Sequence, residues 1–229
     1  MKTTSYAASK AVVIKGVITL LLLLFCNAVT SVPLVNKFLG LQNWQVRFFV
    51  SRLFYWVCLA FALYYCTNRE KQKLLLWREE KQPWWFYLVS AVAMYFVLNI
   101  GALIMYRLFL LLGISVNEPG EKEMLAALRG RFGLVLLASV TAGFVEELLF
   151  RGYLIPRLEY LFNNRYFAVI ISSLLFGLFH FGYFSWFHIA STFFIGLMFA
   201  LHYVKYRNIK FLIVFHFLWD LLILWIKVR

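Results

Sequence analysis

The chain has 229 residues, of which 63% are hydrophobic and 14% are charged, and its formal net charge is +13. Soluble domains carry about 45–50% apolar and about 25% charged residues, so this composition excludes an ordinary water-soluble globule. The apolar runs are continuous rather than alternating, which excludes a membrane β-barrel. We therefore expect an all-α fold, a polytopic transmembrane helical bundle, because backbone groups in lipid must be paired within each helix.

Seven apolar segments approach the length of about 20 residues that a helix needs to cross a bilayer. The three cysteines, Cys26, Cys58 and Cys66, lie within them, form no CxxC pair and are expected to pack as small apolar residues. In chain order, the expected spans are residues 11–29, 48–66, 84–105 with an extension to 112, 133–154, 168–181, 184–204 and 211–226.

These spans divide the chain into N-terminal transmembrane helices (residues 1–112), an external connection (113–132) and a C-terminal transmembrane core (133–229). The connection contains the turn signature Asn117-Glu118-Pro119-Gly120, followed by a candidate for a short polar helix. The first span follows Lys2 and Lys10 as a secretion signal would. However, it is long and lacks a clear small-residue cleavage site, so we expect it to be retained.

The basic residues lie mainly between the apolar runs, where they set topology and meet anionic lipid headgroups. If the N-terminus is cytoplasmic, the internal segments carry twice as many Lys and Arg residues as the external ones. The sequence therefore predicts a cytoplasmic N-terminus, the inner (cell) membrane of a bacterium, contact with membrane lipids and no nucleic-acid partner.

The most informative residues are ionisable groups inside the fourth span, because a charge at bilayer depth is costly. Glu146 and Glu147 are adjacent, and Arg151 follows one turn later. Glu147 and Arg151 are four residues apart and can pair on one helix face. Glu146 is rotated by about 100° from Glu147. We therefore interpret one carboxylate as structural and the other as available for chemistry.

A polar turn at Asn163-Asn164 joins the fourth and fifth spans, which predicts a helical hairpin. Glu146 and His180 are nearly equidistant from this turn, about 25 Å away at about 1.5 Å per residue. They can thus face each other, and a carboxylate beside an imidazole can hold and deprotonate a water molecule. We expect this site in the cytoplasmic half of the membrane, nearer the turn, or close to its middle.

The last span contributes His216 and Asp220, which are four residues apart and share a helix face. Each of these polar groups also has a structural explanation, since intramembrane His and Asp side chains often only bind neighbouring helices. His188 and His202 have no acidic partner at helical spacing and are interpreted as structural or interfacial. Gly196 and Ala200 are interpreted as a helix-packing face.

Three motifs together resemble the signatures of the CPBP family, the CAAX-protease and bacteriocin-processing (Abi) intramembrane proteases. They are Glu146-Glu147-x-x-x-Arg151, Phe176-x-x-x-His180 and His216-x-x-x-Asp220, in order on successive helices of the segment 133–226. The family includes the Ras-converting enzyme, which cleaves prenylated C-termini. The resemblance implies an intramembrane endopeptidase acting on a peptide or a lipid-anchored protein.

By position, the resemblance implies that Glu146 is the general base and that His180 helps to hold the water. His216 and Asp220 would stabilise the oxyanion, Glu147 and Arg151 would shape the site, and Phe176 would pack beneath His180. The family's last motif often ends in Asn, whereas Asp220 donates a hydrogen bond only when protonated and otherwise orients His216. No cofactor or metal is expected, although Glu and two His side chains could also ligate zinc.

Two other functions stay open at this stage. The protein could be a non-catalytic membrane immunity factor or scaffold that binds a peptide or a partner. It could also be a proton-coupled transporter that uses the buried carboxylates, although the spans show no interrupted helices in related halves.

Overall fold

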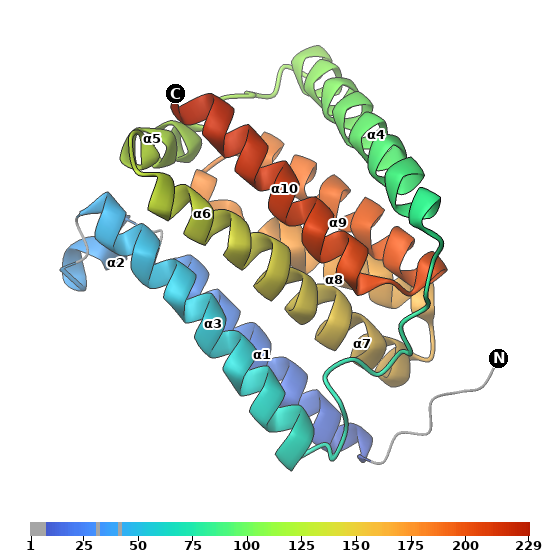
Figure 1. Ribbon diagram of the computed structural model, residues 1–229. Helices are drawn as coiled ribbons and strands as arrows, with labels where there is room; N and C mark the ends of the chain where they lie inside the picture. Colours follow the sequence, from blue (N-terminus) through green and yellow to red (C-terminus); the bar gives the residue numbers. More distant parts are fainter. Residues whose placement is uncertain (1–7, 31–32, 41–42) are drawn as a thin grey trace.

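The computed structural model describes residues 8–30, 33–40 and 43–229 (Figure 1). This part of the chain is built of helices and contains no strand. Within it, seven helices are long and apolar enough to cross a membrane, so the predicted fold class and number of spans are confirmed.

The helices before the polar connection are α1 (Lys10–Val29), α2 (Pro33–Phe38), α3 (Trp44–Asn68) and α4 (Trp84–Leu111). The connection holds the short helix α5 (Pro119–Leu128). The remaining elements are α6 (Phe132–Val140), two π-helical segments (Thr141–Glu146 and Leu148–Leu154), α7 (Ile155–Phe162), α8 (Arg165–Leu178), a 3-10 turn (Phe181–Tyr183), α9 (Trp186–Tyr206) and α10 (Ile209–Val228).

The fourth span is continuous from Phe132 to Phe162, eight residues beyond the end predicted at 154. Pro156 stands in the first turn of α7, directly after a π-helical segment, and the helix continues through it. The span then ends at Asn163, which adopts a left-handed conformation with φ 53°.

Polar caps set where several spans begin. Asn43 accepts hydrogen bonds from the backbone at the start of α3, which explains why this helix begins four residues before its predicted start at 48. Asn164 caps α8 in the same way, so Asn163 and Asn164 form the expected hairpin turn between α7 and α8. Ser185 and Asn208 cap α9 and α10.

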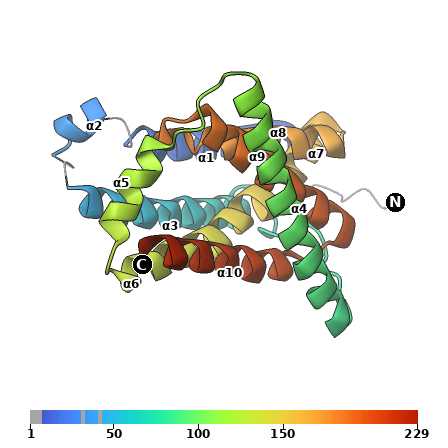
Figure 2. The ribbon, with the colours of Figure 1, turned by 90° about the horizontal axis from the view of Figure 1, so that it is seen from above.

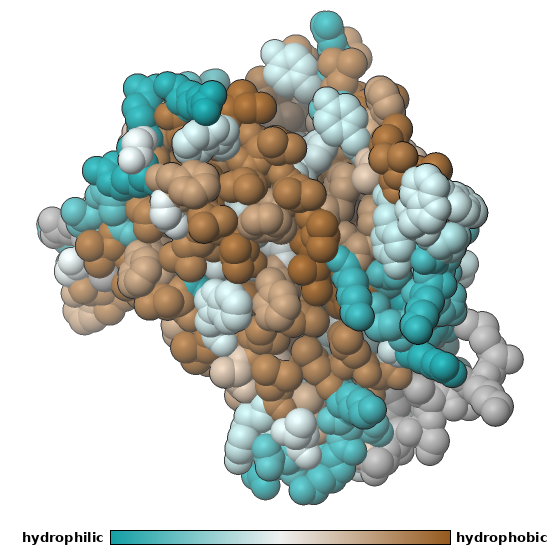
Figure 3. Space-filling model, in the orientation of Figure 1, coloured by the Kyte–Doolittle hydropathy of each residue, from teal (hydrophilic) through white to brown (hydrophobic). Residues whose placement is uncertain are grey.

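The two π-helical segments, which carry the buried polar residues of the fourth span, pack against α3, α8 and α10. α1 and α3 pack side by side along one flank, whereas α4 contacts mainly α9 and lies at the edge of the bundle (Figures 1 and 2). A broad apolar band crosses the middle of the surface, with polar residues at the α5 end and at the opposite end (Figure 3). This pattern fits a bundle that is encircled by lipid.

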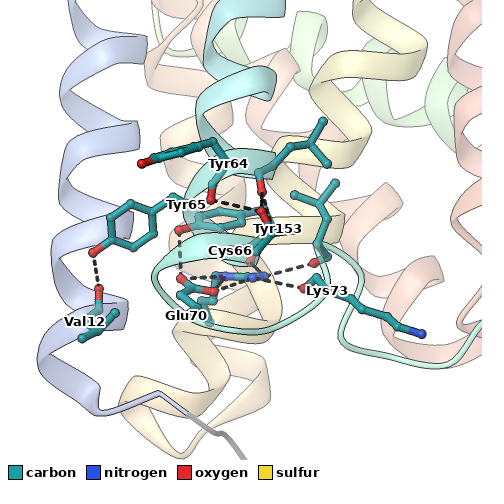
Figure 4. Close-up of polar contacts among 11 residues, drawn as sticks. Val12, Tyr64, Tyr65, Cys66, Glu70, Lys73 and Tyr153 are labelled. Carbon is teal, nitrogen blue, oxygen red and sulfur yellow. Dashed lines mark hydrogen bonds and ion pairs between the residues drawn. The ribbon is translucent and has the colours of Figure 1, made fainter.

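A buried ion pair fastens the loop after α3 to α7 (Figure 4). Arg157 and Glu70 are both fully buried, and Arg157 Nη2 lies 2.6 Å from Glu70 Oε2. Tyr153 donates its hydroxyl to the other Glu70 oxygen at 3.1 Å, and Arg157 also donates to the carbonyl of Leu74. Arg157, which follows the predicted end of the fourth span at 154, is therefore an internal residue and not a free charge in a loop.

We predict that Glu70→Gln lowers the free energy of unfolding by about 3–5 kcal/mol, because it leaves the buried Arg157 cation without a counter-charge. Thermal and denaturant unfolding of the protein in detergent micelles would measure this loss. Glu80→Gln, at an exposed position of the same loop, is the matched control. Equal stabilities of the two variants would contradict the structural role of the ion pair.

Candidate active site

The two adjacent glutamates of the fourth span have different surroundings. Both are buried, and Glu147 Oε1 lies 2.9 Å from Arg151 Nη1, which is the pairing expected from their spacing. Arg151 also donates to the carbonyl of Gly196 on α9 at 3.1 Å, and its guanidinium lies over the Phe176 ring. Arg151 is thus held by contacts with α8, α9 and its own helix.

His216 of α10 binds the same oxygen of Glu147. Its Nδ1 lies 2.8 Å from Glu147 Oε1, and because a carboxylate only accepts, Nδ1 carries the proton. Its Nε2 lies 3.8 Å from Asp220 Oδ2, which is an ion-pair distance but too long for a hydrogen bond. Glu147 is therefore the shared acceptor for Arg151 and His216, and Nε2 is the His216 nitrogen that remains available.

Close contact between backbones makes this arrangement possible. Gly143 lies against α10, where an added Cβ would come within 2.6 Å of the Phe217 nitrogen and 2.7 Å of the Ile213 carbonyl oxygen. Only a residue without a side chain allows the fourth span and α10 to approach so closely. Since His216 is the neighbour of Phe217, this contact sets the distance between His216 and Glu147.

Glu146 is paired with a residue that sequence reasoning did not select. Arg52 of α3 places Nη1 3.7 Å from Glu146 Oε1. One turn later on α3, Trp56 donates to the Thr141 hydroxyl at 3.2 Å and stacks on Phe144, which holds α3 against the fourth span. A lone arginine in an apolar span was the available signal, but nothing in the sequence paired it with Glu146.

His180 follows the C-terminal end of α8, just before the 3-10 turn. Its Nδ1 lies 2.7 Å from the Phe176 carbonyl oxygen, so Nδ1 donates and Nε2 is left as the basic nitrogen. Its ring packs on Phe176, with 4.8 Å between the ring centroids. Among the described residues, no hydrogen bond joins His180 to Glu146, so the expected facing of these two side chains is not a direct contact.

A cavity of about 490 Å³ lies beside this turn. Its walls are formed by the end of α1, the first part of α3, one side of α5 and the segment from Phe179 to Phe184, which includes His180. All of these lie at the α2 and α5 end of the bundle (Figures 1 and 2). Glu146 lies midway along its span, at one of the two depths that the sequence predicted, whereas His180 and its cavity lie towards the end of the bundle away from Asn163-Asn164.

The other two histidines have separate environments. His188 pairs with Glu118 from the external connection, 2.6 Å away, and stacks on Tyr183, so its acidic partner comes from a distant part of the chain. Burial by itself would raise the pKa of Glu118, but the hydrogen bond and charge of His188 outweigh it and hold that pKa below its usual value. His202 packs between Tyr206 and Phe211 as part of an aromatic cluster.

The described residues contain no group of three or more His, Cys, Asp or Glu side chains arranged to hold a metal ion. Gly196, interpreted from the sequence as part of a packing face, lies against Phe176, where an added Cβ would come within 3.0 Å of the ring. The same glycine supplies the carbonyl that binds Arg151.

The fold and the site define a polytopic membrane protein that carries carboxylate and imidazole groups inside its bundle. Residues 129–222 match the family model of the type II CAAX prenyl endopeptidase Rce1-like proteins, which is the CPBP resemblance that the three motifs predicted. No curated protein and no solved structure matches the chain. The family supports a protease function and an integral membrane location.

We predict that Gly143→Ala lowers the free energy of unfolding by about 1–3 kcal/mol, because the new methyl group meets rigid backbone and displaces α10. Gly133→Ala in the same span is the matched control, since an added Cβ there meets nothing within 4 Å. Denaturant unfolding in micelles measures both variants. If Gly143→Ala were as stable as Gly133→Ala, the close contact would not be a constraint on the site.

Proposed function

We propose that the protein is an intramembrane endopeptidase in which Glu146 activates water for attack on a peptide bond. The observation that carries this proposal is that the two glutamates have different contacts. Glu147 is committed to Arg151 and His216, whereas Glu146 has one ion-pair partner, Arg52, at a distance longer than a hydrogen bond. Glu147 Oε2 also makes no hydrogen bond, but Glu147 is anchored to two partners through Oε1, so Glu146 is the carboxylate free to bind and deprotonate a water molecule.

The reaction requires one base, one water and stabilisation of one oxyanion. Glu146 takes a proton from the water as its oxygen bonds to the carbonyl carbon, which gives a tetrahedral intermediate with a negative oxygen. The C–N bond then breaks, and Glu146 returns the proton to the leaving nitrogen. The products are a carboxylic acid and an amine, so atoms and charge balance without a cofactor or metal.

The other site residues would support this cycle. His180, with Nε2 as its basic nitrogen, would help to hold the water. His216, with Nδ1 already bound to Glu147, would donate from Nε2 to the developing oxyanion when its ring carries both protons. Asp220, 3.8 Å from that Nε2, would donate to the oxyanion when protonated and otherwise orient His216. Phe176 and Arg151 would fix the positions of His180 and Glu147.

The proposed substrate is a peptide or a lipid-anchored protein that reaches the site from the membrane. The proposed location is the inner membrane of a bacterium, and the distribution of basic loop residues favours a cytoplasmic N-terminus. The cavity lies at the bundle end opposite the start of α1. This orientation therefore implies that the substrate is bound from the external side.

We predict that Glu146→Gln lowers the cleavage rate by about 10²–10⁴-fold, because glutamine cannot accept the proton of the water. Quantitative proteomics of membranes containing either the wild type or the variant would identify peptides whose cleavage depends on Glu146. The purified proteins would then be compared on such a peptide.

Glu159→Gln is the matched control, since Glu159 forms a partly exposed ion pair with Arg165 at the hairpin turn, far from Glu146 along the chain. It is expected to cleave at the wild-type rate. Undiminished cleavage by a folded Glu146→Gln protein would reject the glutamate mechanism. Loss of a cellular phenotype with no change in any cleavage would favour a binding function instead.

A further inference from the structure

Two arginines of α3 line the cavity that also contains His180. Arg47 lies towards the start of the helix, and Arg52 lies beside Glu146. In the described part of the chain, Glu123 is the one acidic residue in the cavity wall, and it already accepts a hydrogen bond from the Trp44 indole at 2.8 Å. The cavity wall therefore carries two cationic groups and one acidic group, and one of the cations also borders the proposed catalytic carboxylate.

Both guanidinium groups retain unused hydrogen-bond donors. Arg52 Nε is buried and makes no hydrogen bond, and its ion pair with Glu146 is longer than a hydrogen bond. The Arg52 guanidinium lies over the Phe48 and Tyr55 rings at 5.2 and 5.0 Å. Arg47 lies over the Trp44 ring at 4.8 Å and forms no ion pair among the described residues. Because a desolvated donor is costly when unpaired, the buried Arg52 Nε favours an acceptor in the cavity, and the partly exposed Arg47 adds a second cation beside it.

We propose, on the basis of the proposed function, that Arg47 and Arg52 form a carboxylate-binding subsite that selects peptide substrates with an anionic group near the cleaved bond. A planar carboxylate matches the fork of guanidinium donors, and the aromatic walls suit the apolar side chains beside it. Arg52 borders both the cavity and Glu146. A carboxylate bound to it therefore places neighbouring peptide bonds within reach of Glu146.

The carboxylate can come from two sources, a free C-terminus or an Asp or Glu side chain. Two pairs of fluorescent hexapeptide pools, built from Ala, Leu and Phe, distinguish these sources. One pair differs in having a C-terminal acid or a C-terminal amide, and the other differs in having one internal Glu or one internal Gln. Binding is measured by fluorescence anisotropy on the full-length Glu146→Gln protein in micelles, where the peptides are not consumed. We expect the acid or the Glu form to bind about tenfold or more tightly than its neutral counterpart.

Arg47→Gln and Arg52→Gln, each added to Glu146→Gln, are expected to remove this preference. Arg107→Gln is the matched control, because Arg107 is exposed on α4 and does not line the cavity. A preference for the C-terminal acid identifies that source, and a preference for internal Glu identifies the other. The proposal is overturned if neither form is preferred, or if the preference survives both arginine substitutions.

This experiment stands apart from the test of catalysis. If a wild-type protein that binds carboxylate peptides cleaves none of them, the subsite stands and the proposed function fails. If Glu146-dependent cleavage is seen with no discrimination between acid and amide or between Glu and Gln, the function stands and the subsite fails. Should Arg52→Gln not fold, Arg47→Gln and the comparison of peptide forms still decide the question.

Discussion

The pairing of charges inside apolar helices is the constraint on which the rest of this structure depends. Removing a charge from water is so unfavourable that a buried ionisable group needs a partner with good geometry. Glu147 meets this need for Arg151 of its own span and for His216 of α10, while Arg151 reaches the Gly196 carbonyl on α9. One carboxylate thus fixes three spans relative to one another, and α10 comes close enough because Gly143 has no side chain.

This constraint also explains why two adjacent glutamates have different tasks. A structural network of one arginine and one imidazole needs a single carboxylate, so the second is not required for stability. Its partner, Arg52, comes from α3, outside the segment 129–222 that matches the family model. The proposed site is therefore completed by a helix that the matching segment does not contain, which gives the N-terminal spans a role beyond filling the membrane.

The features that were predictable from the sequence depend on short-range regularities. Seven spans follow from hydropathy, and the Glu147–Arg151 pair follows from helical spacing within one segment. Contacts between distant segments have no corresponding spacing pattern in the sequence. Three ion pairs are of this kind: Arg52 with Glu146, Glu118 with His188 and Glu70 with Arg157. Spacing also paired His216 with Asp220, whereas its shorter contact is with Glu147. Equal distances from the hairpin turn related Glu146 to His180 but did not reveal at which end the cavity lies.

Because the cavity lies at one end of the bundle, the orientation of the protein in the membrane determines the side from which a substrate would reach it. Some of the basic residues that favour a cytoplasmic N-terminus are neutralised, since Arg157 is buried with Glu70 and Arg165 pairs with Glu159. A basic residue at the cavity end of the bundle is neutralised as well, because Lys227 pairs with Glu121. The unpaired lysines and arginines of the loop after α3 and of the turn before α10 still outnumber those near α5. In the proposed orientation the cavity faces outward, and its arginine-lined wall would meet anionic groups of peptides on that side of the membrane.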